Sequence, residues 1–168
     1  MKFETIIIGA GRSGMAKALQ LQKAGKNCAV FSKGRSLYGY NGEEFREMGG
    51  TVFMGDGVVR ATIENGLVKA IYSENFGSIP LEADNYFLAT GKFFAGGLRA
   101  DMEHIYEPIF GLDVEYLKNR EEWFNRDFAA HQPFLDFGVK TDAEGHAIKD
   151  GQSIKNLYPI GEILSNIK

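Results

Sequence analysis

Cysteine is almost absent from this sequence, and so is any long apolar run. Cys28 is the single cysteine among 168 residues, so no disulfide can form within the chain. This excludes the disulfide-stabilised secreted domains and suits a reducing compartment. Cys28 lies in an apolar stretch, where we expect a small core side chain. No apolar run approaches the roughly 20 residues that span a bilayer, and residues 1–4 lead into a predicted strand without a signal peptide.

Histidine is also scarce, and basic residues are slightly outnumbered by acidic ones, 19 to 22. The net charge is −3, which argues against a surface for nucleic acid or anionic membrane. The three histidines, His104, His131 and His146, are far apart and lack metal-site spacing, so we expect no metal and place them in loops or on the surface. The sequence offers no Ser-His-Asp or Cys-His arrangement. It therefore identifies no catalytic residue.

Glycine, in contrast, occurs 21 times, and its pattern near the N-terminus is the most informative feature. The apolar run Ile6–Ile8 leads into Gly9-x-Gly11-x-x-Gly14. Gly9 permits a tight turn from strand to helix, Gly11 lets a pyrophosphate approach the backbone, and Gly14 allows close packing of helix on strand. The first N–H groups of the helix then face the phosphates. The motif predicts the start of a dinucleotide-binding unit.

The residues that follow complete this unit and depart from its usual pattern at one point. An amphipathic helix ends at Gly25, and residues 28–31 form a second apolar strand, so the unit closes within about 30 residues. Such strands usually end in Asp or Glu, which binds the ribose, whereas this one ends in Ser32 and Lys33. Ser32 can bind a hydroxyl, more weakly than a carboxylate. Lys33 and Arg35 are either solvated loop charges or the phosphate-binding groups of an NADP site.

Beyond this unit the sequence predicts short strands separated by glycine-containing turns. Asn65-Gly66, between two strand-like runs, is a strong hairpin signal, and a three-stranded meander is expected. In chain order, the expected strands cover residues 51–54, 58–64, 67–73, 79–81 and 85–89, with a closing strand and glycine turn over 157–162. Helices are expected over 43–48 and 116–124, and a polar turn region over 140–151. The predicted fold class is α/β: a single Rossmann-like FAD/NAD(P)-binding domain over residues 1–168, with a parallel sheet and a β-meander on one face.

This order of elements resembles that of the two-dinucleotide-binding-domain flavoproteins, and more specifically one subunit of anaerobic glycerol-3-phosphate dehydrogenase, the one designated B. The resemblance covers residues 1–36 and most of 49–166. The stretches that carry it are residues 3–9, 19–25, 32–36, 89–98, 107–114, 132–133, 137–139 and 156–157. Members of that family are longer. They have a large central substrate domain between the positions of Ser36 and Gly49, and a helix beyond the position of Glu162 that approaches the flavin.

The resemblance implies a flavin-binding oxidoreductase subunit that oxidises glycerol 3-phosphate and passes electrons toward quinone. The implied cofactor is FAD or FMN, and the implied partners are other dehydrogenase subunits. The expected location is cytoplasmic, with membrane association through a partner subunit and no direct insertion. Two alternatives stay open: an NADP-binding module, and a non-catalytic interaction protein that keeps the fold.

The glycine motif and the resemblance together assign the residues expected to bind the cofactor. Lys92 is the best-placed cation for stabilising a reduced flavin, with a solvated loop lysine as the alternative. Glu162 stands where related flavoproteins have an Asp on the ribityl chain. The full set is Gly9, Gly11, Arg12, Ser13 and Gly14 at the phosphates, Ser32 and Lys33 at the far end of the nucleotide, and Thr90, Gly91, Lys92, Gly161 and Glu162 on the flavin side.

The sequence also predicts an exposed apolar face, because the domain that usually covers the sheet is missing. It should lie near residues 38–40 and along residues 92–110, whose apolar side chains include Phe93, Phe94, Leu98, Ile105, Tyr106, Ile109 and Phe110. Contiguous apolar patches of this kind usually mark interfaces. We therefore expect a homodimer or a partner subunit there, unless residues 92–150 fold back over the sheet.

Overall fold

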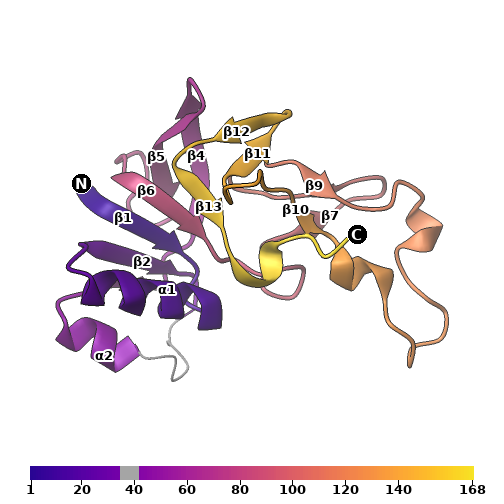
Figure 1. Cartoon of the computed structure of the whole chain (residues 1–168), viewed down its shortest axis with the longest axis horizontal. Coiled ribbons are helices and arrows are strands. Elements are labelled where there is room, and N and C mark those ends of the chain that lie inside the picture. The colour runs from indigo at the N-terminus through magenta and orange to yellow at the C-terminus, as the bar shows by residue number, and fades with distance from the viewer. Residues whose placement is uncertain (35–41) are drawn as a thin grey trace.

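A five-stranded parallel sheet forms the centre of the protein in a computed structural model that describes residues 1–34 and 42–168. The strand order is β13-β6-β1-β2-β3, and every neighbouring pair runs parallel. The bounds are β1 Lys2–Ile8, β2 Cys28–Ser32, β3 Thr51–Met54, β6 Glu82–Leu88 and β13 Leu157–Pro159. Figure 1 shows β13, β6, β1 and β2 side by side, and β3 pairs with the outer edge of β2. The α/β class and the Rossmann-like sheet predicted from the sequence are confirmed.

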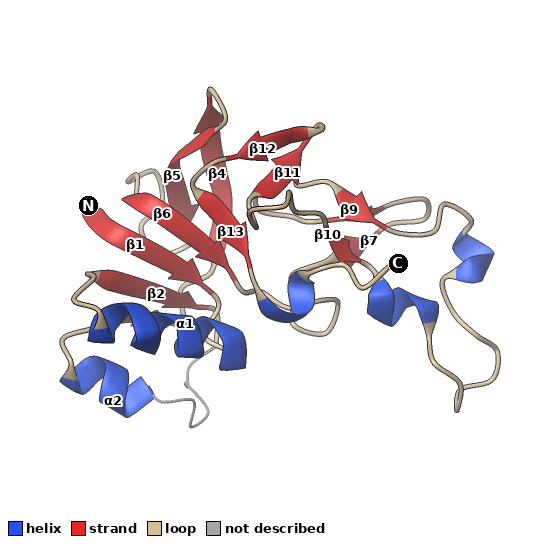
Figure 2. Cartoon of the chain, in the orientation of Figure 1, coloured by secondary structure: helices blue, strands red, loops and turns tan. Residues whose placement is uncertain are grey.

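Two helices cover one face of this sheet (Figure 2). They are α1, Arg12–Lys23, and α2, Gly42–Glu47. Met15 and Phe45 from the helices pack with Ile7 and Cys28 from the strands in one buried cluster. Burial raises the pKa of the Cys28 thiol to about 11, so this cysteine is a core residue, as predicted. Gly25, with φ of 79°, ends α1 at its expected position.

A β-hairpin covers the opposite face. It consists of β4, Val58–Glu64, and β5, Leu67–Ser73, joined at Asn65-Gly66, where both residues have positive φ as a type I′ turn requires. Alternation along β1 explains the two layers, because Ile6 and Ile8 point to the hairpin side while Ile7 points to the helices. The expected third meander strand is reduced to one bridge between Ile71 and Leu81.

The segment after β6 extends away from the sheet as short strands and turns (Figure 1). The short strands are β7 Arg99–Ala100, β8 Ile105–Tyr106, β9 Val114–Glu115 and β10 Gly138–Val139; the short helices are η1 Arg120–Glu122 and η2 Pro133–Asp136. The predicted helix over 116–124 is wrong, since only η1 forms. Asn119 accepts a hydrogen bond from the Glu121 N–H and so caps this turn, and Trp123 is buried against Phe137. A nine-residue helix has little stability of its own, so these contacts decide the conformation.

The predicted polar turn region contains a second hairpin. It is formed by β11, Ala147–Lys149, and β12, Gln152–Ile154, which pair antiparallel. Asp150 and Gly151 both have positive φ, and this Asp-Gly pair is the local signal by which the sequence could have indicated the hairpin. After β13 the chain ends with η3, Gly161–Ile163, beside the N-terminus of α1 (Figure 1).

The expected apolar face is largely covered within the chain. Leu98, Ile105 and Phe110 are buried in the cluster that lies under the hairpin. The two most exposed aromatic side chains among the described residues are Phe94, at 95% exposure, and Phe128, at 92%. The other half of the prediction, residues 38–40, lies outside the described residues. Neither α1 nor any other helix in residues 1–34 and 42–168 has the length and apolar character to cross a membrane.

Candidate functional site

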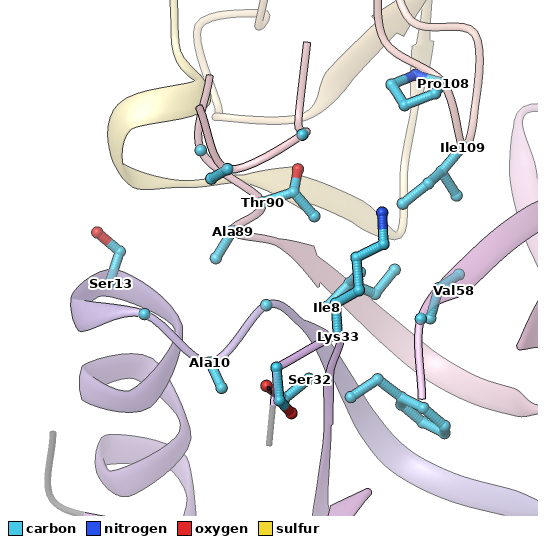
Figure 3. Close-up of a pocket in the computed structure, with 18 of the residues that line it drawn as sticks. Ile8, Ala10, Ser13, Ser32, Lys33, Val58, Ala89, Thr90, Pro108 and Ile109 are labelled. Atoms are coloured by element: carbon cyan, nitrogen blue, oxygen red, sulfur yellow. Dashed lines mark hydrogen bonds between the residues drawn. The ribbon is translucent and has the colours of Figure 1, made fainter. Parts of the chain in front are cut away.

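A cavity of about 960 Å³ opens at the carboxyl ends of β1, β2 and β6. Open α/β sheets bind ligands at this edge, because the loops that leave the strands converge there. Figure 3 shows the start of α1 on one side, the end of β2 below and the residues after β6 above. The lining of the cavity includes nine of the predicted residues: Gly9, Gly11, Arg12, Ser13, Ser32, Lys33, Thr90, Gly91 and Glu162.

The three glycines of the motif have different surroundings, as the sequence predicts. Gly9 has φ of 108°, and a Cβ there would clash with the carbonyl of Ala89. A Cβ on Gly14 would clash with the carbonyl of Gly9, so Gly14 sets the close packing of helix and strand and does not line the cavity. A Cβ on Gly11 would meet nothing within 4 Å. The backbone at Gly11 is therefore open to a ligand.

The N-terminus of α1 faces this open space. Gly11 occupies the N-cap position, and no side chain of residues 1–34 and 42–168 forms a capping hydrogen bond there. Free N–H groups and the positive end of the helix dipole make such a terminus a site for anions. Ser13 lines the cavity and contacts the turn at Gly161, where a Cβ would clash with the Ser13 hydroxyl. Gly161 itself lies outside the cavity lining and permits this approach.

At the end of β2, Ser32 and Lys33 present different groups to the cavity. The Ser32 side chain is buried, and its hydroxyl donates to the carbonyl of Gly34 at 3.3 Å. The Lys33 side chain rises through the cavity toward Ile109 (Figure 3). Its ammonium lies 3.9 Å from the position of a Cβ on Gly96. The cavity thus carries a cation where related sites carry an acid.

The residues after β6 divide between the cavity and its surroundings. The Thr90 hydroxyl is buried and has no hydrogen-bond partner among the described residues. An unpaired buried hydroxyl is costly, and Thr90 is one of the residues that line the cavity. Lys92 lies outside the cavity lining and donates to the Leu135 carbonyl at 2.7 Å. Partial burial lowers the pKa of Lys92, against the opposite effect of Asp136 and Glu162.

The histidines lie away from this cavity. His104 and His131 are exposed, as expected. His146 lies in the loop before β11, within the expectation of a loop or surface position, but it is buried there, with Nδ1 2.9 Å from Asp142 Oδ2. Ser153 and His146 both hydrogen-bond the Asp142 carboxylate and hold its pKa well below its ordinary value. This pair fixes the turn before β11.

The cavity also contains residues that the sequence did not indicate. They come from the hairpin and from the segment after β6, far from the glycine motif in the chain. A contact between such distant segments leaves no local pattern in one sequence. The additional lining residues include Val58, Val59, Glu74, Phe94, Arg99, Pro108 and Ile109.

Comparison with known proteins identifies the class of this fold. The model of the FAD binding domain family matches residues 4–41 and 36–168, and the chain belongs to this family. The cofactor of the family is FAD, the first of the two flavins predicted from the sequence.

Curated relatives carry the name of anaerobic glycerol-3-phosphate dehydrogenase, in each case of the subunit designated B. The protein from Yersinia enterocolitica is 45% identical over 120 residues, 71% of this chain and 28% of the relative. The protein from Aliivibrio fischeri (strain ES114) is 38% identical over 174 aligned positions, 94% of this chain and 38% of the relative. The chain therefore spans little more than a third of these relatives at most. A solved structure of the Staphylococcus aureus bacillithiol disulfide reductase aligns over 60% of this chain and 41% of its own, with 17% identity and a TM-score of 0.47.

Proposed function

We propose that this chain provides the FAD site of an oxidoreductase that oxidises glycerol 3-phosphate and passes the electrons toward quinone. The names of the curated relatives support the substrate. The observation that carries the proposal is the cavity at the glycine turn, which is lined by the start of α1 and by Thr90, whose hydroxyl has no partner among the described residues. Its volume is within the usual range for sites of small molecules and cofactors, about 300–1,000 Å³.

Different residues of the site contact different parts of FAD. The N–H groups that follow Gly11 bind the pyrophosphate, and Arg12 and Ser13 border it. Ser32 and Lys33 face the adenosine half, and Thr90, Gly91 and Glu162 face the flavin half. Lys92 and Gly161 do not line the cavity. Lys92 supplies a positive charge near the flavin, and Gly161 permits the close approach of Ser13. Bound FAD supplies the redox chemistry, while the protein supplies binding, orientation and electrostatics.

Residues 1–168 act in this proposal as one nucleotide-binding domain that works with other dehydrogenase subunits. The relatives are named as one subunit of a dehydrogenase, which supports such partners. The exposed side chains of Phe94 and Phe128 are candidates for that contact or for a homodimer.

Titration of the purified chain with FAD, FMN and NADP tests the cofactor assignment. We expect FAD to raise the melting temperature and to lose fluorescence on binding. Stabilisation by NADP alone would favour the NADP-binding alternative, for which the position of Lys33 in the cavity is the supporting observation. The substrate is tested separately, by reduction of a dye acceptor with glycerol 3-phosphate in a preparation that contains the partner subunits.

A further inference from the structure

The end of β2 lacks the carboxylate that most dinucleotide sites place against the adenosine ribose. The Ser32 hydroxyl is buried and already donates to Gly34. Lys33 supplies only N–H donors, so it cannot accept a hydrogen bond from a ribose hydroxyl. The Ser32 hydroxyl can still accept through its lone pairs, but more weakly than a carboxylate. If FAD binds as proposed above, a strong acceptor for its ribose must therefore come from another part of the chain.

A chain of hydrogen bonds ties the end of β2 to the end of the hairpin. The N–H of Asp56 donates to the Ser32 carbonyl at 2.9 Å, and the N–H of Gly55 donates to the Gly34 carbonyl at 2.9 Å. The Asp56 carboxylate, 1% exposed, accepts from the Ser73 hydroxyl at 2.8 Å. The residue after β5 is therefore held beside β2.

That residue is Glu74. Its N–H donates to the Gly57 carbonyl at 2.9 Å, and the next N–H, of Asn75, donates to Asp56 Oδ1 at 2.9 Å. The backbone at Glu74 and Asn75 is thus held by hydrogen bonds to Asp56 and Gly57. The Glu74 backbone therefore has a defined position, although the Glu74 side chain is exposed to the cavity and to solvent.

The Glu74 side chain lines the cavity next to Lys33. A Cβ built on Gly57 would lie 3.6 Å from Glu74 Oε1 and 3.3 Å from Lys33 Cγ, so both side chains border one point. Within residues 1–34 and 42–168, the Glu74 carboxylate forms no hydrogen bond or ion pair. Within that part of the chain neither of its oxygens has a partner, so both can accept a hydrogen bond.

We infer that Glu74 replaces the missing acid of β2 and accepts a hydrogen bond from a ribose hydroxyl of the adenosine half of FAD. The inference rests on the proposed FAD site. It assigns adenosine recognition to a residue 42 positions beyond Ser32 in the chain, at the end of the hairpin that covers the sheet.

The direction in which neutralising Glu74 changes the affinity for FAD separates this role from a general electrostatic one. FAD is anionic, so a negative side chain that merely lies near the cavity weakens its binding, and neutralising that side chain should tighten it. A carboxylate that accepts a hydrogen bond has the opposite effect, and its loss weakens binding. The isosteric Glu74→Gln variant keeps an acceptor oxygen but removes the charge-assisted bond.

The experiment compares wild type, Glu74→Gln and the control Glu64→Gln, which alters an exposed acid of the same hairpin outside the cavity lining. Isothermal titration with FAD, FMN, ADP and 2′,3′-dideoxy-ADP gives the affinities. We expect Glu74→Gln to weaken FAD and ADP by about tenfold. FMN, which has no adenosine, and dideoxy-ADP, which has no ribose hydroxyls, should bind wild type and variant alike. Glu64→Gln should match wild type throughout.

The outcomes are distinct. Failure of wild type to bind FAD would refute the proposed function itself. FAD binding by wild type with equal or tighter binding by Glu74→Gln would refute the role of Glu74. A tenfold loss that persists with dideoxy-ADP would refute the ribose hydroxyl as its partner. The melting temperature without ligand should be the same in all three proteins, because the Glu74 side chain takes no part in the hydrogen bonds that hold its backbone.

Discussion

Replacement of Gly11 by valine separates binding from folding at the glycine turn. Gly11 has φ of −77° and ψ of −168°, a conformation that any residue adopts, and its Cβ position is open. The N-cap loses about 1 kcal/mol when a branched apolar residue replaces glycine. Reduced entropy of the unfolded chain offsets about 0.4–1 kcal/mol of this loss. We therefore expect the free energy of unfolding without ligand to change by less than about 1 kcal/mol.

Binding of FAD should respond much more strongly. FAD at 100 times its Kd stabilises the folded protein by about 2.7 kcal/mol, which for a chain of this size raises the melting temperature by roughly 5–10 °C. A valine side chain would occupy the space of the pyrophosphate and remove at least one charge-assisted hydrogen bond, a loss of about tenfold or more in affinity. The same FAD concentration would then stabilise the variant by about 1.4 kcal/mol or less.

Gly14→Ala is the matched control. Its Cβ would clash with the Gly9 carbonyl, so we expect a loss of about 1–3 kcal/mol in unfolding free energy from overpacking. Thermal melts of wild type and both variants, with and without FAD, check the pair. The reasoning is refuted if Gly11→Val binds FAD as tightly as wild type, because the phosphate then lies elsewhere.

Three further predictions concern other parts of the molecule. Thr90→Val should leave the unliganded protein as stable or slightly more stable, because it removes an unpaired buried hydroxyl, and should weaken FAD by roughly two- to tenfold in a titration. Hydrogen bonds in the folded protein lower the pKa of Asp142 below its ordinary value of 3.8, so the carboxylate stabilises the fold above pH 3.8 and this contribution is lost as the pH falls further. The difference in melting temperature between wild type and Asp142→Asn should therefore shrink below that pH, and a constant difference would contradict this. Phe94 and Phe128 should support association, so light scattering should give a mass above 18.6 kDa that rises with concentration and falls after substitution of both by serine; a constant monomer mass would leave only a different partner.

The β-α-β unit can be predicted from sequence because its determinants are local. Periodicity places Ile6–Ile8 in a strand, glycine geometry fixes the turn, and Gly25 ends the helix, all within one short segment. The Asn65-Gly66 hairpin follows the same logic, since two adjacent residues set the turn type. The expected bounds of these two hairpin strands, 58–64 and 67–73, agree with the observed β4 and β5.

The predictions that failed depend on distant contacts. The stretch around Trp123 has helical periodicity, yet Trp123 is buried against Phe137, 14 positions later, and its indole N–H donates to the Leu117 carbonyl. Long-range packing of this kind outweighs the weak intrinsic preference of a short helix. His146 lies in a loop, as predicted, but its burial was not predicted, because that burial depends on contact with Tyr158, 12 positions later.

The sequence by itself determined the class of fold and the position of the glycine turn, because both depend on residue types at fixed short spacing. Only the tertiary structure decided which groups share the cavity. It brought Lys33 and Glu74 to one point, left Thr90 without a partner among the described residues and placed Lys92 behind the wall. The physical reason is that parallel strands gather their carboxyl ends at one edge of the sheet, whatever the distance between them along the chain.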